Sequence, residues 1–188
     1  MIYKFLDNVQ KIAEDLKNQD EEILSIINIL KNVKEKGNKV FIIGNGGSAG
    51  TATHMACDLF KTSKIKAISF DDIPLNSAIN NDEGWDNLFT YQLERLYNYG
   101  DVLIAFSVHG GVGSDKAGAW SQNINKAIEY VKLNSGKTIG FSGFDGGWMK
   151  DNCDVCIVIP AESTPLVESF HVVLHHYIAF ELQEGKRI

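Results

Sequence analysis

The sequence predicts a doubly wound, three-layer αβα sandwich with one five-stranded parallel sheet, preceded by two amino-terminal helices. Two observations predict this class. Short apolar runs alternate with amphipathic stretches along the chain, and the runs are apolar throughout instead of alternating with polar residues. Strands of that kind are buried on both faces, as in parallel sheets covered by helices. Right-handed crossovers between such strands distribute the helices over both sides of the sheet.

Composition limits the class of protein further. The 188 residues are enough for one well-buried core, so we expect a single domain over residues 1–188. A net charge of −6 argues against a nucleic-acid partner, because phosphate backbones attract an excess of Lys and Arg. The first 20 residues carry scattered acids and no long apolar core, so we expect neither a signal peptide nor a membrane partner. Three cysteines, an odd number, favour a reducing cytoplasm over a disulfide framework.

Two helical patterns open the chain. Phe5, Val9, Ile12 and Leu16 recur at spacings of three and four residues, and a second series runs from Ile23 to Leu30. Their amphipathic faces must pack on something, either the domain or a neighbouring subunit. We assign residues 1–36 to these helices and expect them to pack in an oligomer.

After Gly37, strands and helices alternate to the end of the chain. The apolar runs predict strands over residues 39–43, 66–70, 101–106, 137–141 and 155–159. The stretches between and after them predict helices over residues 49–60, 85–97, 121–133 and 165–183. We find no internal repeat, low-complexity segment or linker.

Three polar, glycine-rich segments follow strands and therefore fall at the carboxyl edge of the sheet, where open α/β sheets bind ligands. They are residues 44–48, 107–111 and 142–147. The first, Gly44-Asn45-Gly46-Gly47-Ser48, precedes a helix, and a helix amino terminus offers free N–H groups to an anion. The alternative is a tight structural turn. The spacing is not G-x-G-x-x-G and no Walker lysine follows, so we expect no nucleotide or organic cofactor.

Several motifs together resemble the sugar isomerase (SIS) domain family, and within it the phosphoheptose isomerases. They occur in the family's order and cover nearly the whole chain. The matching stretches are Phe41-Ile42-Ile43-Gly44-Asn45-Gly46-Gly47-Ser48, His54-x-x-x-Asp58-Leu59, Asn81-Asp82-x-Gly84, Gly100-Asp101-Val102-Leu103-Ile104, Gly140-Phe141-Ser142-Gly143-x-Asp145-Gly146-Gly147 and Thr164-Pro165-x-x-Glu168-x-x-His171.

The resemblance implies isomerisation of sedoheptulose 7-phosphate to a glycero-manno-heptose 7-phosphate. It also implies a homotetramer or dimer with a site shared between subunits. The substrate-binding residues that we expect from the motifs and their neighbours are Asn45, Gly46, Gly47, Ser48, Asp82, Ser107, His109, Ser121 and Glu168.

Two helices concentrate the candidate acid–base groups. His54 and Asp58 are spaced i, i+4 and share one helix face, while Glu168, His171, His175 and His176 crowd the last predicted helix. An aldose–ketose isomerase needs a base and an acid near the reacting carbons. The resemblance implies that Asp58 is the base and His176 the acid. It also implies that His54, Asp58, Glu168 and His176 match positions where some members hold zinc, which imidazoles and carboxylates suit.

Departures from the family leave alternatives open. Asp58 replaces a glutamate and Glu168 a glutamine, and ideal helix spacing puts His175, not His176, nearest the Glu168 face. A lone histidine on a helix is also often an ordinary hydrogen-bonded residue. Cys153 and Cys156 form a lone pair at the start of a strand, where ordinary buried cysteines are expected.

The phosphate loop departs further from the family. The family's Ser-Thr-Ser-Gly run is replaced by Ser107-Val108-His109-Gly110-Gly111, and about nine residues are inserted before Ser121. His109 or Lys116 would compensate for the lost hydroxyl donor, or both are simply exposed to solvent. Such insertions are often lids or binding loops. An isomerase of a different sugar phosphate, or a non-catalytic SIS module that binds a phosphosugar, therefore remains an alternative.

Overall fold

The computed structural model describes residues 2–111 and 121–183. Its centre is one parallel sheet with the strand order β2-β1-β3-β4-β5. The strands are β1 (Lys39–Gly44), β2 (Lys66–Ser69), β3 (Val102–Phe106), β4 (Lys137–Ser142) and β5 (Val155–Val158). The predicted parallel sheet is confirmed, and each strand lies within one residue of its predicted limits.

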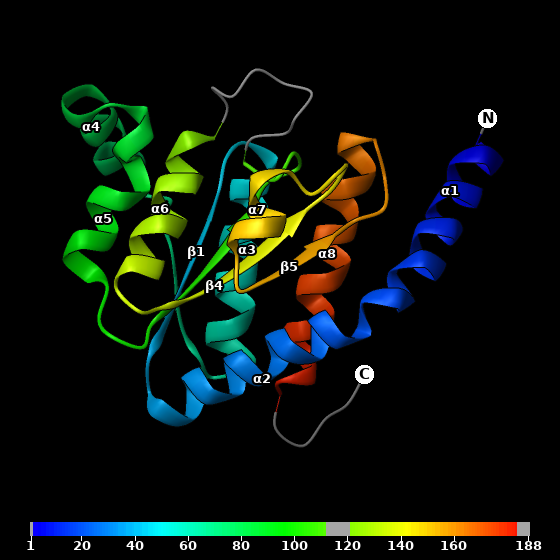
Figure 1. The fold of residues 1–188 in the computed structure, drawn as a ribbon, viewed down its shortest axis with the longest axis horizontal. Coiled ribbons are helices and arrows are strands. Elements are labelled where there is room, and N and C mark those ends of the chain that lie inside the picture. Colours follow the sequence, from blue (N-terminus) through cyan, green and yellow to red (C-terminus); the bar gives the residue numbers. More distant parts are fainter. Residues whose placement is uncertain (1, 112–120, 184–188) are drawn as a thin grey trace.

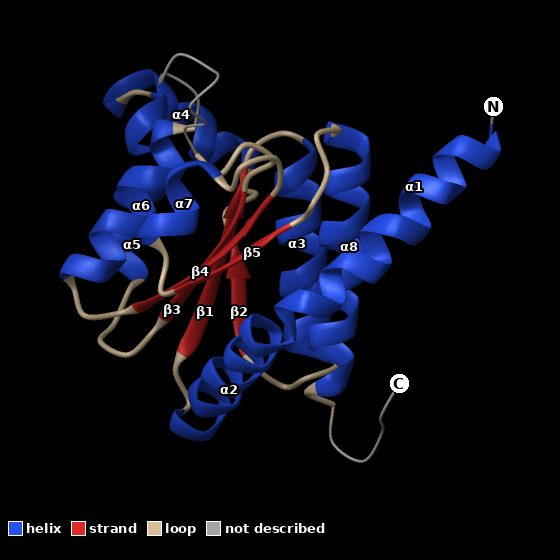
Figure 2. Cartoon of the chain, turned by 45° about the vertical axis from the view of Figure 1, so that its right-hand side comes forward, coloured by secondary structure: helices blue, strands red, loops and turns tan. Residues whose placement is uncertain are grey.

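Helices cover both faces of this sheet, as Figure 2 shows with the sheet nearly edge-on. They are α1 (Ile2–Asp15), α2 (Asp20–Lys36), α3 (Gly47–Lys61), α4 (Ile73–Glu83), α5 (Leu88–Leu96), α6 (Gln122–Leu133), α7 (Gly147–Asn152) and α8 (Thr164–Glu181), with short 3₁₀ turns at Leu16–Gln19 and Trp85–Asn87. No helix among the described residues is both long enough and apolar enough to cross a bilayer.

The strands divide their side chains between two cores, because successive residues of a strand point to opposite faces. Val40 and Ile42 of β1 pack with α2, α3 and α8, whereas Phe41 and Ile43 pack with α5, α6 and α7. All four side chains are essentially inaccessible to solvent. The predicted burial of the strands on both faces is therefore confirmed for β1, β3 and β4, whereas the edge strands β2 and β5 are only partly buried.

The first helix departs from the layered body. Figures 1 and 2 show α1 running away from the sheet, with the amino terminus at its far end. Only Ile12 in this helix is buried, while Ile2, Tyr3, Phe5 and Leu6 remain exposed. Most of the apolar face of α1 is therefore not buried by the rest of the described chain.

Two helices were absent from the sequence-based prediction. The first, α4, contains Pro74 and three asparagines among its eleven residues, all of low helix propensity. Its start is stabilised by the Asp72 carboxylate, which accepts a hydrogen bond from the Leu75 N–H at 2.7 Å. The second, α7, has only six residues and begins at Gly147. Both lack the repeated apolar spacing on which the prediction depends.

Candidate functional site

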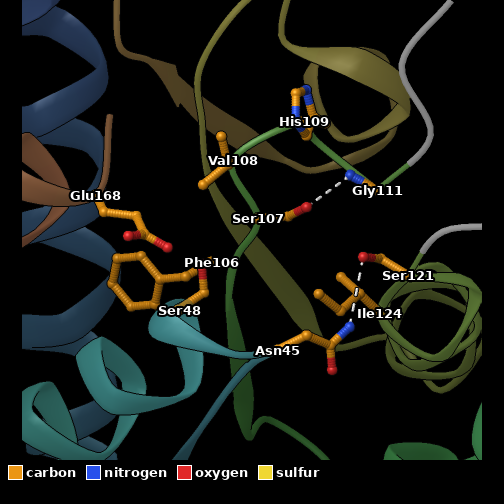
Figure 3. A pocket seen from close by; sticks show the side chains of 10 residues that line it. All are labelled: Asn45, Ser48, Phe106, Ser107, Val108, His109, Gly111, Ser121, Ile124 and Glu168. Carbon is orange, nitrogen blue, oxygen red and sulfur yellow. Dashed lines mark hydrogen bonds between the residues drawn. The ribbon is translucent and has the colours of Figure 1, made fainter. Parts of the chain in front are cut away.

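A pocket lies where the strand order changes direction, between the carboxyl ends of β1 and β3 (Figure 3). Successive connections leave this point toward opposite edges of the sheet, which opens a crevice for a ligand. The cavity measures about 140 Å³. Its lining residues are Asn45, Ser48, Phe106, Ser107, Val108, His109, Gly111, Ser121, Ile124 and Glu168. Six predicted substrate-binding residues therefore meet here: Asn45, Ser48, Ser107, His109, Ser121 and Glu168.

The turn after β1 shapes one wall. Gly46 has φ of 58° and ψ of −125°, a backbone conformation that suits glycine, and it allows α3 to begin at Gly47. Asn45 is held by Asn123 of α6 through two reciprocal amide hydrogen bonds, each of 3.0 Å. Its amide also donates to the Ser121 hydroxyl at 3.4 Å. This pairing could not be predicted from the sequence, because the two asparagines are 78 residues apart.

The loop after β3 forms the opposite wall. The Ser107 hydroxyl accepts a hydrogen bond from the Gly111 N–H at 3.0 Å, so the loop folds back on its own first residue. Gly110 has φ of +62° and packs so tightly that an added Cβ would lie 1.9 Å from the Gly146 carbonyl oxygen. The loop after β4 therefore supports the Ser107 loop from behind. The inserted residues 112–120, including Lys116, lie outside the described residues.

Glu168 brings a carboxylate into this pocket from α8, and Figure 3 shows it on the same side of the cavity as Ser48. A Cβ on Gly47 would lie only 2.4 Å from its Oε1 atom, so the absence of a side chain at Gly47 makes room for the carboxylate. Carboxylate oxygens accept hydrogen bonds from sugar hydroxyls. Glu168 can therefore accept hydrogen bonds from hydroxyl groups of a ligand in this cavity.

A second cluster lies further along α3 and α8, and it contains His54, Asp58, His175 and His176. The Asp58 Oδ2 atom lies 3.6 Å from His54 Nε2, 3.7 Å from His175 Nδ1 and 3.6 Å from His176 Nε2. The Nε2 atoms of His54 and His176 are 3.4 Å apart. One carboxylate therefore faces three imidazoles.

Burial separates these histidines. His175 is completely inaccessible to solvent, whereas the side chains of His54 and His176 are half-exposed. Burial, followed by the charges of His176 and His54, lowers the pKa of His175 to about 3. His171 is equally inaccessible and packs against the stacked rings of Phe106 and Phe141, and burial lowers its pKa to about 4. Both buried imidazoles are therefore neutral near pH 7.

The predicted metal-binding set is only partly brought together. Among the described residues, one ring nitrogen each of His54, His175 and His176 lies within 4.8 Å of the others, and this group does not include Glu168. Helical spacing explains the separation, because Glu168 precedes His175 by seven residues, or roughly 10 Å along the axis. Helical spacing alone does not decide which of His175 and His176 faces inward, and in the folded chain both reach the cluster.

Two other expectations lie apart from both clusters. Asp82 is exposed on α4 and accepts a hydrogen bond from the Asn81 amide at 2.7 Å, away from the residues that line the pocket. The thiols of Cys153 and Cys156 flank Gly140, and burial raises the pKa of both, to about 11 for Cys156. Protonated, shielded thiols of this kind are poor nucleophiles, which fits ordinary buried cysteines.

Comparison with known proteins places this architecture in a family. A family model described as the SIS domain matches residues 4–143. Phosphoheptose isomerase from Aliarcobacter butzleri is 33% identical over 184 residues, which cover 95% of this chain and 93% of that protein. The chain belongs to the SIS domain family and, within it, to the phosphoheptose isomerases. Phosphoheptose isomerase from Nitratiruptor is 37% identical over 165 residues, covering 85% of this chain and 81% of the relative.

Solved structures support the same fold for this SIS domain. Phosphoheptose isomerase GmhA from Neisseria gonorrhoeae superposes with a TM-score of 0.86 at 24% identity, covering 96% of both chains. A phosphoheptose isomerase from Francisella tularensis gives a TM-score of 0.86 at 22% identity and covers 96% of this chain and 95% of that one. At these identities the likeness concerns the fold.

Proposed function

We propose that this SIS domain is an aldose–ketose isomerase that converts sedoheptulose 7-phosphate to D-glycero-D-manno-heptose 7-phosphate. The observation that carries the proposal is the Asp58 carboxylate beside three imidazoles, on the same two helices that border the phosphosugar pocket. Curated relatives named phosphoheptose isomerase, at 33% and 37% identity over most of both chains, supply the reaction class.

The pocket between β1 and β3 would hold the phosphate. Its donors are the hydroxyls of Ser48, Ser107 and Ser121 and the Asn45 amide, near the backbone N–H groups at the start of α3. A helix amino terminus favours an anion, which supports this assignment. Gly46 and Gly47 would contribute backbone, His109 would close one side, and Glu168 would accept hydrogen bonds from sugar hydroxyls.

The histidine cluster would carry the proton transfer. A base removes a proton from C1 of the ketose while the C2 carbonyl oxygen gains a proton, which gives an enediol. The C1 hydroxyl then loses its proton and becomes the carbonyl as a proton is delivered to C2. We assign the base to Asp58 and the acid to His176. The reacting carbons and the phosphate-bearing C7 lie at opposite ends of the sugar. The separation of roughly 10 Å between Glu168 and the cluster along α8 is consistent with that geometry.

Zinc is the cofactor that we propose for the cluster. The donor types fit, since zinc takes imidazole nitrogen and carboxylate oxygen, and three such nitrogens gather within 4.8 Å. His54, Asp58 and His176 are the members of the expected set that lie together, around the place where the ion would bind. Bound zinc would supply a Lewis acid that polarises the sugar carbonyl.

We further propose that the chain acts as one domain in a cytoplasmic homo-oligomer, a tetramer or dimer. Phe60 of α3 and Val173 and Tyr177 of α8 are exposed apolar side chains on the two helices that carry the half-exposed His54 and His176. A second protomer on this face would bury them and would shield the reaction from water. Three free cysteines, one of them exposed, are consistent with a reducing compartment.

A second candidate function, a non-catalytic module that binds a phosphosugar, is favoured by one feature of the pocket. Its lining includes the Glu168 carboxylate and no lysine or arginine among the described residues. The Glu168 carboxylate would repel a phosphate dianion. The pocket therefore differs from an anion site that is lined by basic side chains. Asp82, which lies away from the pocket within the protomer, would contact sugar only from another protomer.

Turnover decides between the two candidates. The purified protein is incubated with sedoheptulose 7-phosphate, and aldose formation is followed by NMR. We expect Asp58→Asn and His176→Gln each to lower kcat by at least about 100-fold with little change in KM, because they remove proton transfer and not binding. Wild-type protein that binds the sugar phosphate without converting it would establish the binding module instead. Undiminished kcat in both variants would remove the catalytic assignment.

A further inference from the structure

We propose that this chain binds its metal ion through three histidines, His54, His175 and His176, with Glu168 outside the coordination sphere. The inference rests on the metal suggested above for the same cluster. It replaces the ligand set expected from the sequence by one that the folded chain brings together, and it adds a role for His175.

The geometry of the three imidazoles is close to that of a tetrahedral site. Zinc–nitrogen bonds of about 2.0–2.1 Å place neighbouring ligand atoms about 3.3–3.4 Å apart. The Nε2 atoms of His54 and His176 are already 3.4 Å apart, and one nitrogen of His175 lies within 4.8 Å of them. A small rotation of side chains would therefore complete three corners of a tetrahedron.

Of the three histidines, His175 has the least satisfied ring nitrogens. It is completely buried, and neither of its ring nitrogens has a hydrogen-bond partner among the described residues. The Asp58 Oδ2 atom beside it is also buried without a hydrogen-bond partner. A polar group buried without a partner is destabilising, and a bound cation would satisfy both residues at once.

Asp58 would support these ligands electrostatically. Its Oδ2 atom lies 3.6–3.7 Å from a nitrogen of each imidazole, including His175 Nδ1. Carboxylates beside metal-binding histidines orient the rings and make them stronger ligands. The half-exposed side chains of His54 and His176 leave a route for the ion from solvent.

Glu168 is separated from this site by its position in the other pocket. Its carboxylate packs against Gly47 and lines the cavity with Ser48 and Ser107. Three histidine ligands then leave a fourth coordination position open, the arrangement found in catalytic zinc sites. The carboxylate of Glu168 stays available for the sugar.

Metal binding tests the assignment without substrate. Metal-free protein is titrated with Zn²⁺ in competition with a chromophoric chelator. We expect one Zn²⁺ per protomer, with affinity at least about 10-fold lower in His54→Asn, His175→Asn and His176→Asn. Glu168→Gln, the matched control, should keep the wild-type affinity within about twofold. Circular dichroism of each metal-free variant verifies that it folds.

A second measurement needs no substitution. In the Co²⁺-loaded wild-type protein, three sets of paramagnetically shifted imidazole signals are expected in the NMR spectrum. Two sets, or loss of Zn²⁺ affinity in Glu168→Gln with retention in His175→Asn, would overturn the three-histidine assignment. Absence of Zn²⁺ binding by the wild type would overturn it as well, while leaving the isomerase proposal to its turnover assay.

Discussion

At the scale of single residues, burial decides what the histidines can do. His171 packs against the stacked rings of Phe106 and Phe141, and its Nε2 atom lies 3.2 Å from the carbonyl oxygen of Ser142, to which it donates in the neutral form. This contact connects α8 to the end of β4. Desolvation penalises the charged imidazole, so the same packing that fixes the ring also keeps it neutral.

This packing predicts an acid-dependent loss of stability. The pKa of His171 is about 4 in the folded chain against a reference of 6.5, so between these values the unfolded chain binds more protons. The free energy of unfolding should therefore fall as the pH falls from 6.5 to 4. Relative to wild type, His171→Gln should reduce this slope by up to about 1.4 kcal/mol per pH unit in urea unfolding experiments. Parallel pH profiles for the two proteins would contradict the assignment.

At the scale of elements, the loops at the carboxyl edge support one another. The Ser107 loop closes on Gly111, and Gly110 fits against the Gly146 carbonyl of the loop that leads into α7. The Met149 N–H donates to the Gly110 carbonyl oxygen at 2.9 Å. The pocket wall therefore depends on contact between loops that follow different strands.

Substitution of Gly110 measures this contact. Gly110→Ala should lower the free energy of unfolding by at least about 2 kcal/mol, because the new Cβ meets backbone atoms and φ is positive. The matched control is Gly50→Ala within α3, where an added Cβ meets nothing within 4 Å. That change should be neutral or stabilising by up to about 1 kcal/mol, because alanine favours helix. If the two substitutions changed the free energy of unfolding equally in urea denaturation, the close packing of Gly110 against the Gly146 loop would not matter for stability.

At the scale of the whole molecule, helices cover both faces of the sheet, but the apolar side of α1 stays largely exposed to solvent. Ile2, Tyr3, Phe5 and Leu6 expose apolar surface on a helix that projects from the sheet (Figures 1 and 2). Exposed apolar patches of this kind mark interaction surfaces. The sequence-based expectation that residues 1–36 pack in an oligomer stays a prediction, and this geometry supports it.

The expected effect of α1 is on assembly and not on the protomer's core. Leu6→Glu places a charge on the apolar face of α1 and should shift the protein to a smaller species in size-exclusion chromatography with light scattering. Lys4→Glu, on the same exposed helix, should leave the mass unchanged. A wild-type protein that is monomeric at micromolar concentration would contradict the role given to α1.

Much of the fold could be predicted because each strand carries its own signal. The apolar runs gave all five strands to within one residue, and the glycine turn at residues 44–48 was correctly expected at a helix start. Residues such as Asn45 and Ser107 could be assigned to one pocket because the carboxyl ends of parallel strands share an edge of the sheet. The helices α4 and α7 were not predicted, because neither repeats an apolar residue at helical spacing.

The sequence by itself determined the class of fold, the family motifs and the edge of the sheet at which the pocket opens, because local periodicity and strand direction are written in consecutive residues. Only the tertiary structure decided that Glu168 joins the pocket, that both His175 and His176 reach Asp58, and that Asp82 lies apart. Those outcomes depend on how α3 crosses α8 and on where α4 packs. Contacts between distant segments set these distances, and helical spacing within one segment carries no information about them.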